Sequence, residues 1–150
     1  MNIQSEPTIE EKALAHEDMI ALIYGNLSDS IRTLNAQIDA IKAQDPQQLP
    51  QAPLSNLVTD VRKLVVFLKY SSQYLRQSAT ELTAREEILR IKLHLLSILR
   101  ALSDQIRLGD NLAVHDLITE ELRDNLTLWK INVLPLLRPR PAQAIGLTNP

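Results

Sequence analysis

The feature of this sequence that most limits its fold is the spacing of apolar residues between Arg85 and Val133. In both halves of this stretch they recur every three or four positions, which is the period of one face of an α-helix. The first half carries Ile88, Ile91, Leu95, Ile98, Leu99, Leu102 and Ile106, and the second carries Val114, Leu117, Ile118, Leu122, Leu126, Trp129 and Val133. Each stripe needs a partner surface, so the stretch predicts two helices that pack together.

These two helices are expected to be joined at Gly109. A glycine at a helix C-terminus adopts the positive φ that ends many helices, and Arg107 in the preceding turn suits the negative end of the helix dipole. Asp110 or Asn111 can then cap the next helix. Because a short connection makes neighbouring helices antiparallel, residues 85–133 predict a helical hairpin.

Another helix is predicted at residues 8–44, after a flexible N-terminal extension at residues 1–7. Thr8 and Glu11 have the spacing of a capping box, in which each side chain bonds the backbone of the other residue. The following apolar residues alternate steps of four and three: Ile20, Tyr24, Leu27, Ile31, Leu34, Ile38 and Ile41. Such strict heptads suit either one helix of an intramolecular bundle or a coiled-coil dimer. Gly25 costs this helix about 1 kcal/mol relative to Ala, and suggests a kink or a close helix approach.

Prolines separate this helix from the next one. Residues 45–54 contain Pro46, Pro50 and Pro53 and predict an extended loop that acts as a spacer. Ser55 is expected to cap a second helix, whose apolar residues are Leu57, Val58, Val61, Leu64, Val65, Leu68 and Leu75.

A break between the second and third helices is predicted at about residues 77–83. Two possible capping boxes, Ser78 with Glu81 and Thr83 with Glu86, indicate that a helix begins there. The alternative is one long rod, since no glycine or proline interrupts these residues.

Pro135 is expected to end the last helix, because proline lacks the backbone N–H and restricts the residue before it. Residues 55–134 then hold helices two to four, and residues 135–150 form an extended tail. The sequence thus predicts a single all-α domain at residues 1–150. We expect an antiparallel bundle of about four helices, with a Pro-rich loop after helix one.

Composition and motifs argue against several classes of function. The chain has no cysteine, and none of its three histidines stands in the Glu-x-x-His spacing of a di-iron bundle. No glycine-rich phosphate loop or catalytic triad is recognisable, so we expect no catalytic residues, no metal and no cofactor. Arg62, Lys63 and Lys69 are too sparse to predict a nucleic-acid surface. The N-terminus resembles no secretory signal, and no apolar run is long enough for a membrane span, which favours a cytoplasmic protein.

The charges are unevenly distributed along the chain. Residues 1–54 carry three Lys or Arg and eight Asp or Glu, whereas residues 55–150 carry thirteen and ten. The simplest explanation is that an acidic first helix lies against basic neighbours.

Two stretches resemble the FliS-type flagellin export chaperones. The sequence Met-Ile-Ala-Leu-Ile-Tyr-Gly-Asn-Leu-Ser at residues 19–28 is similar to the first-helix motif of that family, in which an aliphatic run meets Leu-Tyr. Residues 93–118 resemble its C-terminal hairpin, with residues 95–100 in the penultimate helix, residues 106–110 at the turn and residues 114–118 in the last helix. Trp129 is also similar.

The resemblance implies a cytoplasmic, ATP-independent chaperone that holds a disordered segment of a secreted filament subunit in apolar grooves. Ile23 and Tyr24 match the Leu-Tyr of the family, and the predicted binding residues are Ile20, Ile23, Tyr24, Leu27 and Ile31. Core packing is an alternative role for them. A competing hypothesis is a structural or regulatory protein that self-associates through the heptads of residues 20–41 and has no client. A nucleic-acid accessory role for Arg62, Lys63, Lys69, Arg138 and Arg140 is a third.

Overall fold

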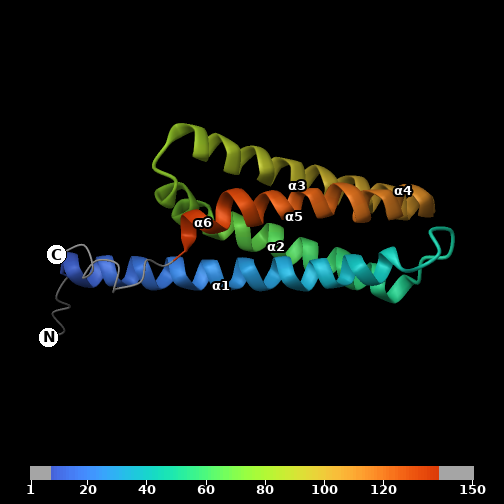
Figure 1. The fold of residues 1–150 in the computed structure, drawn as a ribbon, viewed down its shortest axis with the longest axis horizontal. Coiled ribbons are helices and arrows are strands. Elements are labelled where there is room, and N and C mark those ends of the chain that lie inside the picture. Colours follow the sequence, from blue (N-terminus) through green and yellow to red (C-terminus); the bar gives the residue numbers. More distant parts are fainter. Residues whose placement is uncertain (1–7, 139–150) are drawn as a thin grey trace, which may run out of the picture.

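The computed structural model describes residues 8–138, apart from the side chains of residues 12–14. Within this range the chain forms four long helical segments that run alternately up and down (Figure 1). α1 (Ile9–Lys42), α2 (Gln51–Ser78) and α3 (Leu82–Leu108) are followed by a composite fourth helix. That helix consists of α4 (Asn111–Asp116), the π-helical turn η1 (Leu117–Leu122), α5 (Arg123–Leu128), the π-helical turn η2 (Trp129–Val133) and α6 (Leu134–Leu137). The predicted all-α antiparallel bundle is confirmed.

α1 begins at the predicted capping box. The Glu11 backbone N–H donates to Thr8 Oγ1, and the Thr8 N–H donates to Glu11 Oε2, both at 3.1 Å. The helix then continues through Gly25 without interruption. A Cβ added to Gly25 would meet no other atom within 4 Å, so the predicted close approach is wrong. The predicted flexible N-terminal extension at residues 1–7 lies outside the described residues.

α2 starts earlier than the sequence indicated. Pro50 is its N-cap and Gln51 its first residue, so the loop is shorter than residues 45–54, and Ser55 lies inside the helix instead of capping it. Pro53 is tolerated because it occupies the first turn, where a backbone N–H has no partner within the helix. The Pro-rich composition therefore marks the start of a helix as well as a loop.

The break between α2 and α3 is confirmed, but neither predicted capping box forms there. Glu81 is the N-cap of α3, and its side chain makes no capping hydrogen bond. The turn is held instead by Ala79, which is fully buried and whose carbonyl accepts a 2.7 Å hydrogen bond from Arg85 Nε. Burial of a small apolar residue and one hydrogen bond across the turn replace the predicted side-chain caps.

The connection between α3 and the fourth helix is the predicted one. Gly109 has a φ of 73°, in the left-handed region, and the Asp110 carboxylate accepts from the Ala113 N–H at 3.1 Å. Asn111 Nδ2 also donates to the Gln47 carbonyl at 3.0 Å, which ties this turn to the loop between α1 and α2.

The fourth helix passes through Pro135, so the prediction that proline ends it is wrong. α6 extends to Leu137, and only then does the backbone become extended, at Arg138. A proline inside a regular α-helix clashes with the carbonyl four residues earlier. Here η2 directly precedes α6, and its wider turn changes the register in which the proline meets the preceding carbonyls. The part of the predicted tail beyond Arg138 lies outside the described residues.

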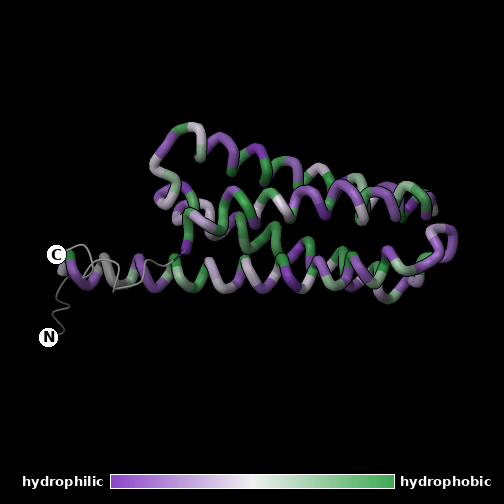
Figure 2. The backbone as a smooth tube through the Cα atoms, viewed as in Figure 1, coloured by the Kyte–Doolittle hydropathy of each residue, from purple (hydrophilic) through white to green (hydrophobic). Residues whose placement is uncertain are grey.

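All four helices contribute to one core. Hydrophobic and hydrophilic residues alternate along each of them (Figure 2). α1 contacts α2 and the fourth helix, and α3 contacts the same two from the other side. The buried side chains include Leu27, Leu34, Ile38, Leu57, Leu64, Leu68, Ile91, Leu95, Leu102, Ile118, Leu122, Leu126 and Trp129. The heptad stripe of α1 from Leu27 to Ile41 therefore packs inside its own chain, as the intramolecular alternative predicted.

Candidate protein-binding surfaces

The predicted binding residues lie mainly in the core. Ile23, Leu27 and Ile31 are 2%, 0% and 4% exposed, so all three side chains are buried. Ile20 and Tyr24 are partly buried against the core. In this conformation Ile20 and Tyr24 are thus the two predicted residues that retain surface for a partner.

The first turns of α1 extend past the end of the bundle (Figure 1). We call residues 9–22 the arm; its last turn still lies beside the bundle, where Ile20 packs against the core. His16 stacks at a tilt on Tyr74 of α2, with ring centroids 5.6 Å apart, which marks where α1 leaves its neighbour. Ile9 is 88% and Leu22 57% exposed, so these two apolar side chains of the arm are largely uncovered by the described residues.

A groove of about 280 Å³ lies between α2 and α3, near the turn that joins them. We call it the α2–α3 groove, and it is lined by Ser72, Leu75, Arg76, Arg85, Glu86, Ile88, Leu89 and Lys92. Leu75 and Ile88 form its buried base, and Leu89 is half exposed. Most of the lining surface is apolar. The leucine and isoleucine side chains contribute to it, and so do the methylene stems of the basic residues, whose charged ends remain in water.

The apolar surface of the groove continues along α3. Leu82, Leu89 and Leu93 are separated by seven and four residues, so they share one face of the helix, and all three are more than half exposed. Three cations, Arg76, Arg85 and Lys92, stand beside this row against one carboxylate, Glu86. The groove therefore combines apolar contact area with a positively charged rim.

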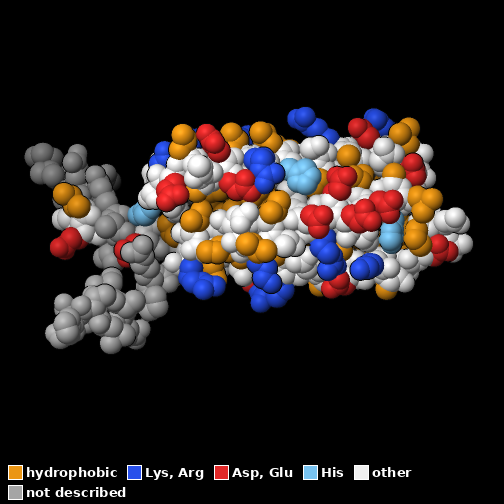
Figure 3. Space-filling view, turned by 45° about the horizontal axis from the view of Figure 1, so that its top comes forward, with side chains coloured by type: hydrophobic (Ala, Val, Ile, Leu, Met, Phe, Trp, Pro, Cys, Tyr) orange, Lys and Arg blue, Asp and Glu red, His pale blue; other side chains and the backbone are white. Residues whose placement is uncertain are grey.

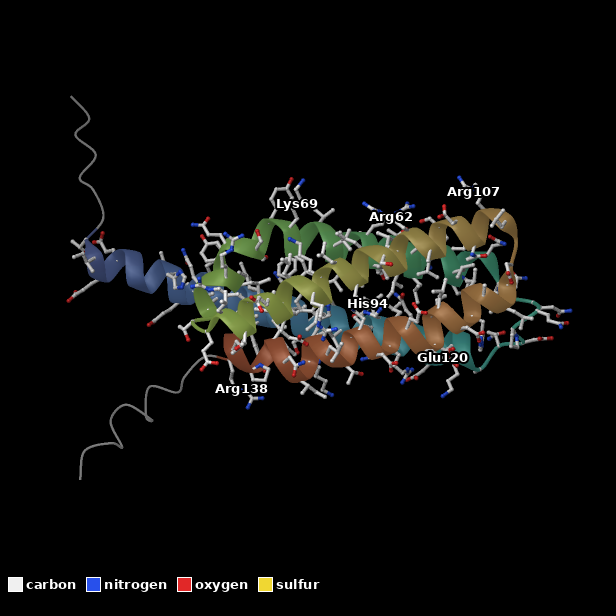
Figure 4. The ribbon with its side chains drawn as sticks, turned by 90° about the horizontal axis from the view of Figure 1, so that it is seen from above. Arg62, Lys69, His94, Arg107, Glu120 and Arg138 are labelled. Atoms are coloured by element: carbon white, nitrogen blue, oxygen red, sulfur yellow. The ribbon has the colours of Figure 1, made fainter. Side chains whose placement is uncertain are left out.

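A buried polar network joins α3 to the fourth helix. Asn125, which is fully buried, donates from Nδ2 to the Ile91 carbonyl at 3.0 Å and lies 3.1 Å from His94 Nδ1. Its Oδ1 accepts from Trp129 Nε1 at 2.9 Å. His94 lies where α3 faces the fourth helix (Figure 4). Because Asn125 uses both its donors and its acceptor inside the protein, we assign this network to helix pairing.

Sequence reasoning missed Asn125, although a signal was present. It stands at a position of the apolar stripe of the last helix, three residues after Leu122 and four before Trp129. A short amide at such a position points to a buried hydrogen-bond network, since an unpaired amide there is costly.

Charged side chains form separate groups on the surface. Figure 3 shows acidic side chains gathered over the start of the fourth helix, where Asp116, Glu120, Glu121 and Asp124 are all exposed. Figure 4 places Arg62 and Lys69 on the opposite edge of the bundle from Arg138. The basic residues considered for nucleic acid are thus not gathered on one face, and Arg140 lies outside the described residues.

One surface ion pair changes an ionisation. Arg90 donates to both carboxylate oxygens of Glu87, at 2.6 and 2.9 Å, and this hydrogen bonding lowers the pKa of Glu87 below its ordinary value. Asn132 adds a 3.3 Å bond from the fourth helix. Since the pair is largely solvated, we expect it to position side chains more than to stabilise the fold.

Comparisons with known protein families, with curated proteins and with solved structures find no match for this chain. None of the described helices combines the length and the apolar character needed to cross a membrane. Among residues 8–138, no three His, Asp or Glu side chains lie close enough together to hold a metal ion. The candidate surfaces therefore rest on their own geometry, which consists of an apolar groove with a basic rim and an uncovered arm.

Proposed function

We propose that this protein is a non-enzymatic helical bundle that binds an apolar segment of another polypeptide in the α2–α3 groove. The observation that carries the proposal is the exposed row of Leu82, Leu89 and Leu93 beside that groove. A row at this spacing is complementary to the apolar face of an amphipathic helix, which binds through side chains three, four and seven residues apart. The basic rim selects helices whose flanks carry carboxylates.

Within this class, the resemblance to FliS-type chaperones supports a more specific proposal. The protein would act in the cytoplasm and hold the disordered C-terminal segment of a flagellin-like secreted subunit as a helix, preventing premature polymerisation. Ile20 and Tyr24, the predicted residues that retain surface, are available for an additional contact. No cofactor or nucleotide enters this proposal.

A binding assay with a matched pair of variants tests the proposal. Leu89→Ser removes an apolar side chain from the groove, and Leu112→Ser removes an equally exposed one from α4, at the other end of the bundle; the two are 55% and 53% exposed. The probe is a labelled peptide with the C-terminal sequence of a flagellin from the same source. We expect Leu89→Ser to weaken binding about tenfold, and Leu112→Ser to leave it unchanged.

Failure has two distinct forms in this assay. If the two variants weaken binding equally, the groove is not the site. If the unaltered protein does not bind the peptide, the flagellin-like client is wrong. Self-association through residues 20–41 remains the alternative hypothesis. It would require the bundle to open, because Ile23 to Ile41 of that stripe already pack in the core.

A further inference from the structure

We propose that two copies of this chain pair end to end, with the arm of each copy lying in the α2–α3 groove of the other. The pairing needs no client and would be present in the purified protein. It bears on the proposed function in one respect, because a client of the groove would have to displace the arm. The partner at this surface is thus a second copy of the chain.

The arm has the properties of a ligand helix. Its capping box fixes the N-terminus of α1 as a helix without help from other elements. Ile9, Met19 and Leu22 are exposed, so apolar area is left to bury. Residues 9–15, which precede the contact of His16 with Tyr74, span roughly 10 Å at the rise of an α-helix, against roughly 17 Å between Leu82 and Leu93 on α3. The free part of the arm can therefore cover the part of the row nearest the groove.

The charges of the arm and the groove are opposite. The arm carries four carboxylates, Glu10, Glu11, Glu17 and Asp18, and one lysine. The groove carries Arg76, Arg85 and Lys92 and one carboxylate. Among the described residues none of these three cations forms an ion pair. Arg85 donates from Nε to the Ala79 carbonyl, and its other guanidinium N–H groups are available to a carboxylate. Complementary potentials of this kind fix the orientation of a complex.

The geometry prevents the arm from reaching the α2–α3 groove of its own chain and favours a closed pair of two copies. α1 is one continuous helix, so the arm points away from the bundle and cannot fold back onto the α2–α3 groove of the same chain. The arm leaves the bundle beside Tyr74, and the groove lies beside the turn after Ser78, so both are at the same end. A two-fold axis across this end brings each arm to the other groove, which closes the assembly as a dimer.

Charge reversal and rescue test this pairing, with light scattering across a range of protein concentrations as the readout. One variant carries Glu17→Lys and Asp18→Lys in the arm. The second carries Arg76→Glu and Lys92→Glu in the groove, and leaves the hydrogen bond of Arg85 intact. We expect each to raise the dissociation constant of the dimer about tenfold, and the four substitutions together to restore it.

A matched control reverses two acidic residues elsewhere. Glu120→Lys with Glu121→Lys changes the net charge by the same amount as the arm variant, on an exposed surface of η1. We expect this variant to dimerise as the unaltered protein does. Added salt should weaken the dimer of the unaltered protein, since the contact is partly electrostatic.

Three results would overturn the pairing: a monomer at every concentration, a dimer that neither reversal weakens, or a loss that the combined variant does not restore. A monomer that still binds the peptide would refute the dimer and leave the proposed function standing. A dimer with the expected charge dependence, whose arm variant binds no peptide even as a monomer, would do the reverse.

Discussion

The two halves of α1 differ in apolar spacing and in surroundings, because the regular steps of four and three residues begin only at Ile20. Between Ile23 and Ile41 the stripe is buried against α2 and the fourth helix, whereas Ile9, Met19 and Leu22 in the arm are exposed. Ile9 is exposed because the neighbouring helices end near Tyr74 and α1 continues past them. Leu22 stands between Ile20 and Ile23, which pack in or against the core, and is exposed because it faces away from the bundle. Apolar periodicity therefore indicates which face of a helix seeks a partner, and the length of the neighbours decides whether that partner is in the same chain.

The largest expected effect separates the two halves by stability. Leu34→Ala removes a side chain that is 1% exposed, and we expect it to lower the free energy of unfolding by about 2–5 kcal/mol. Leu22→Ala in the arm is the matched control and should change it by less than about 0.5 kcal/mol. Urea unfolding of both variants, at a concentration where the unaltered protein is monomeric, measures the difference. Equal losses would mean that Leu22 packs against its own bundle.

A second prediction extends the comparison from apolar to polar residues of the fourth helix. Asn125→Ala leaves the Trp129 Nε1–H and the Ile91 carbonyl without their buried partner, and we expect a loss of about 1–3 kcal/mol in the free energy of unfolding. Asn132→Ala removes only an exposed 3.3 Å bond to Glu87 and should be nearly neutral. Thermal unfolding of the pair provides the measurement. A neutral Asn125→Ala would show that water replaces the amide.

The smallest expected effect concerns Gly25, near the junction of the two halves. Gly25→Ala should raise the free energy of unfolding by up to about 1 kcal/mol, because alanine favours helix and its Cβ would meet open space. Gly109→Ala is the informative contrast, since Gly109 has a φ of 73° and alanine is strained there. Chemical denaturation measures both changes. A loss at Gly25 would indicate that α1 must bend at this point.

Local signals predicted the parts of the fold that depend on few residues. The Thr8 cap, the left-handed Gly109 and the Asp110 cap each rest on neighbours within a few positions, and each is present. The start of α2 and the passage of the last helix through Pro135 were missed for a common reason. In both places the surrounding helix supplies what the proline removes, through a first turn at Pro53 and a π turn before Pro135.

The candidate surfaces were harder to predict because they depend on contacts between distant residues. Ile23 and Leu27 belong to an apolar stripe that could face either the core or a partner protein, and only the placement of α2 and the fourth helix buries them. The α2–α3 groove joins side chains from two helices across the turn at Ala79, and no local pattern marks it. A single sequence contains the apolar faces, and their pairing emerges from the tertiary structure.

The buried Trp129 gives the protein an internal optical probe. It is the single tryptophan of the chain, it is fully buried, and its indole N–H is bonded to Asn125. Emission excited at the indole absorption band should therefore come from one apolar environment and shift to longer wavelength when the fourth helix opens. Because the arm contains no tryptophan, the same signal should stay silent while the arm exchanges partners, so fluorescence can distinguish loss of the fold from loss of an assembly.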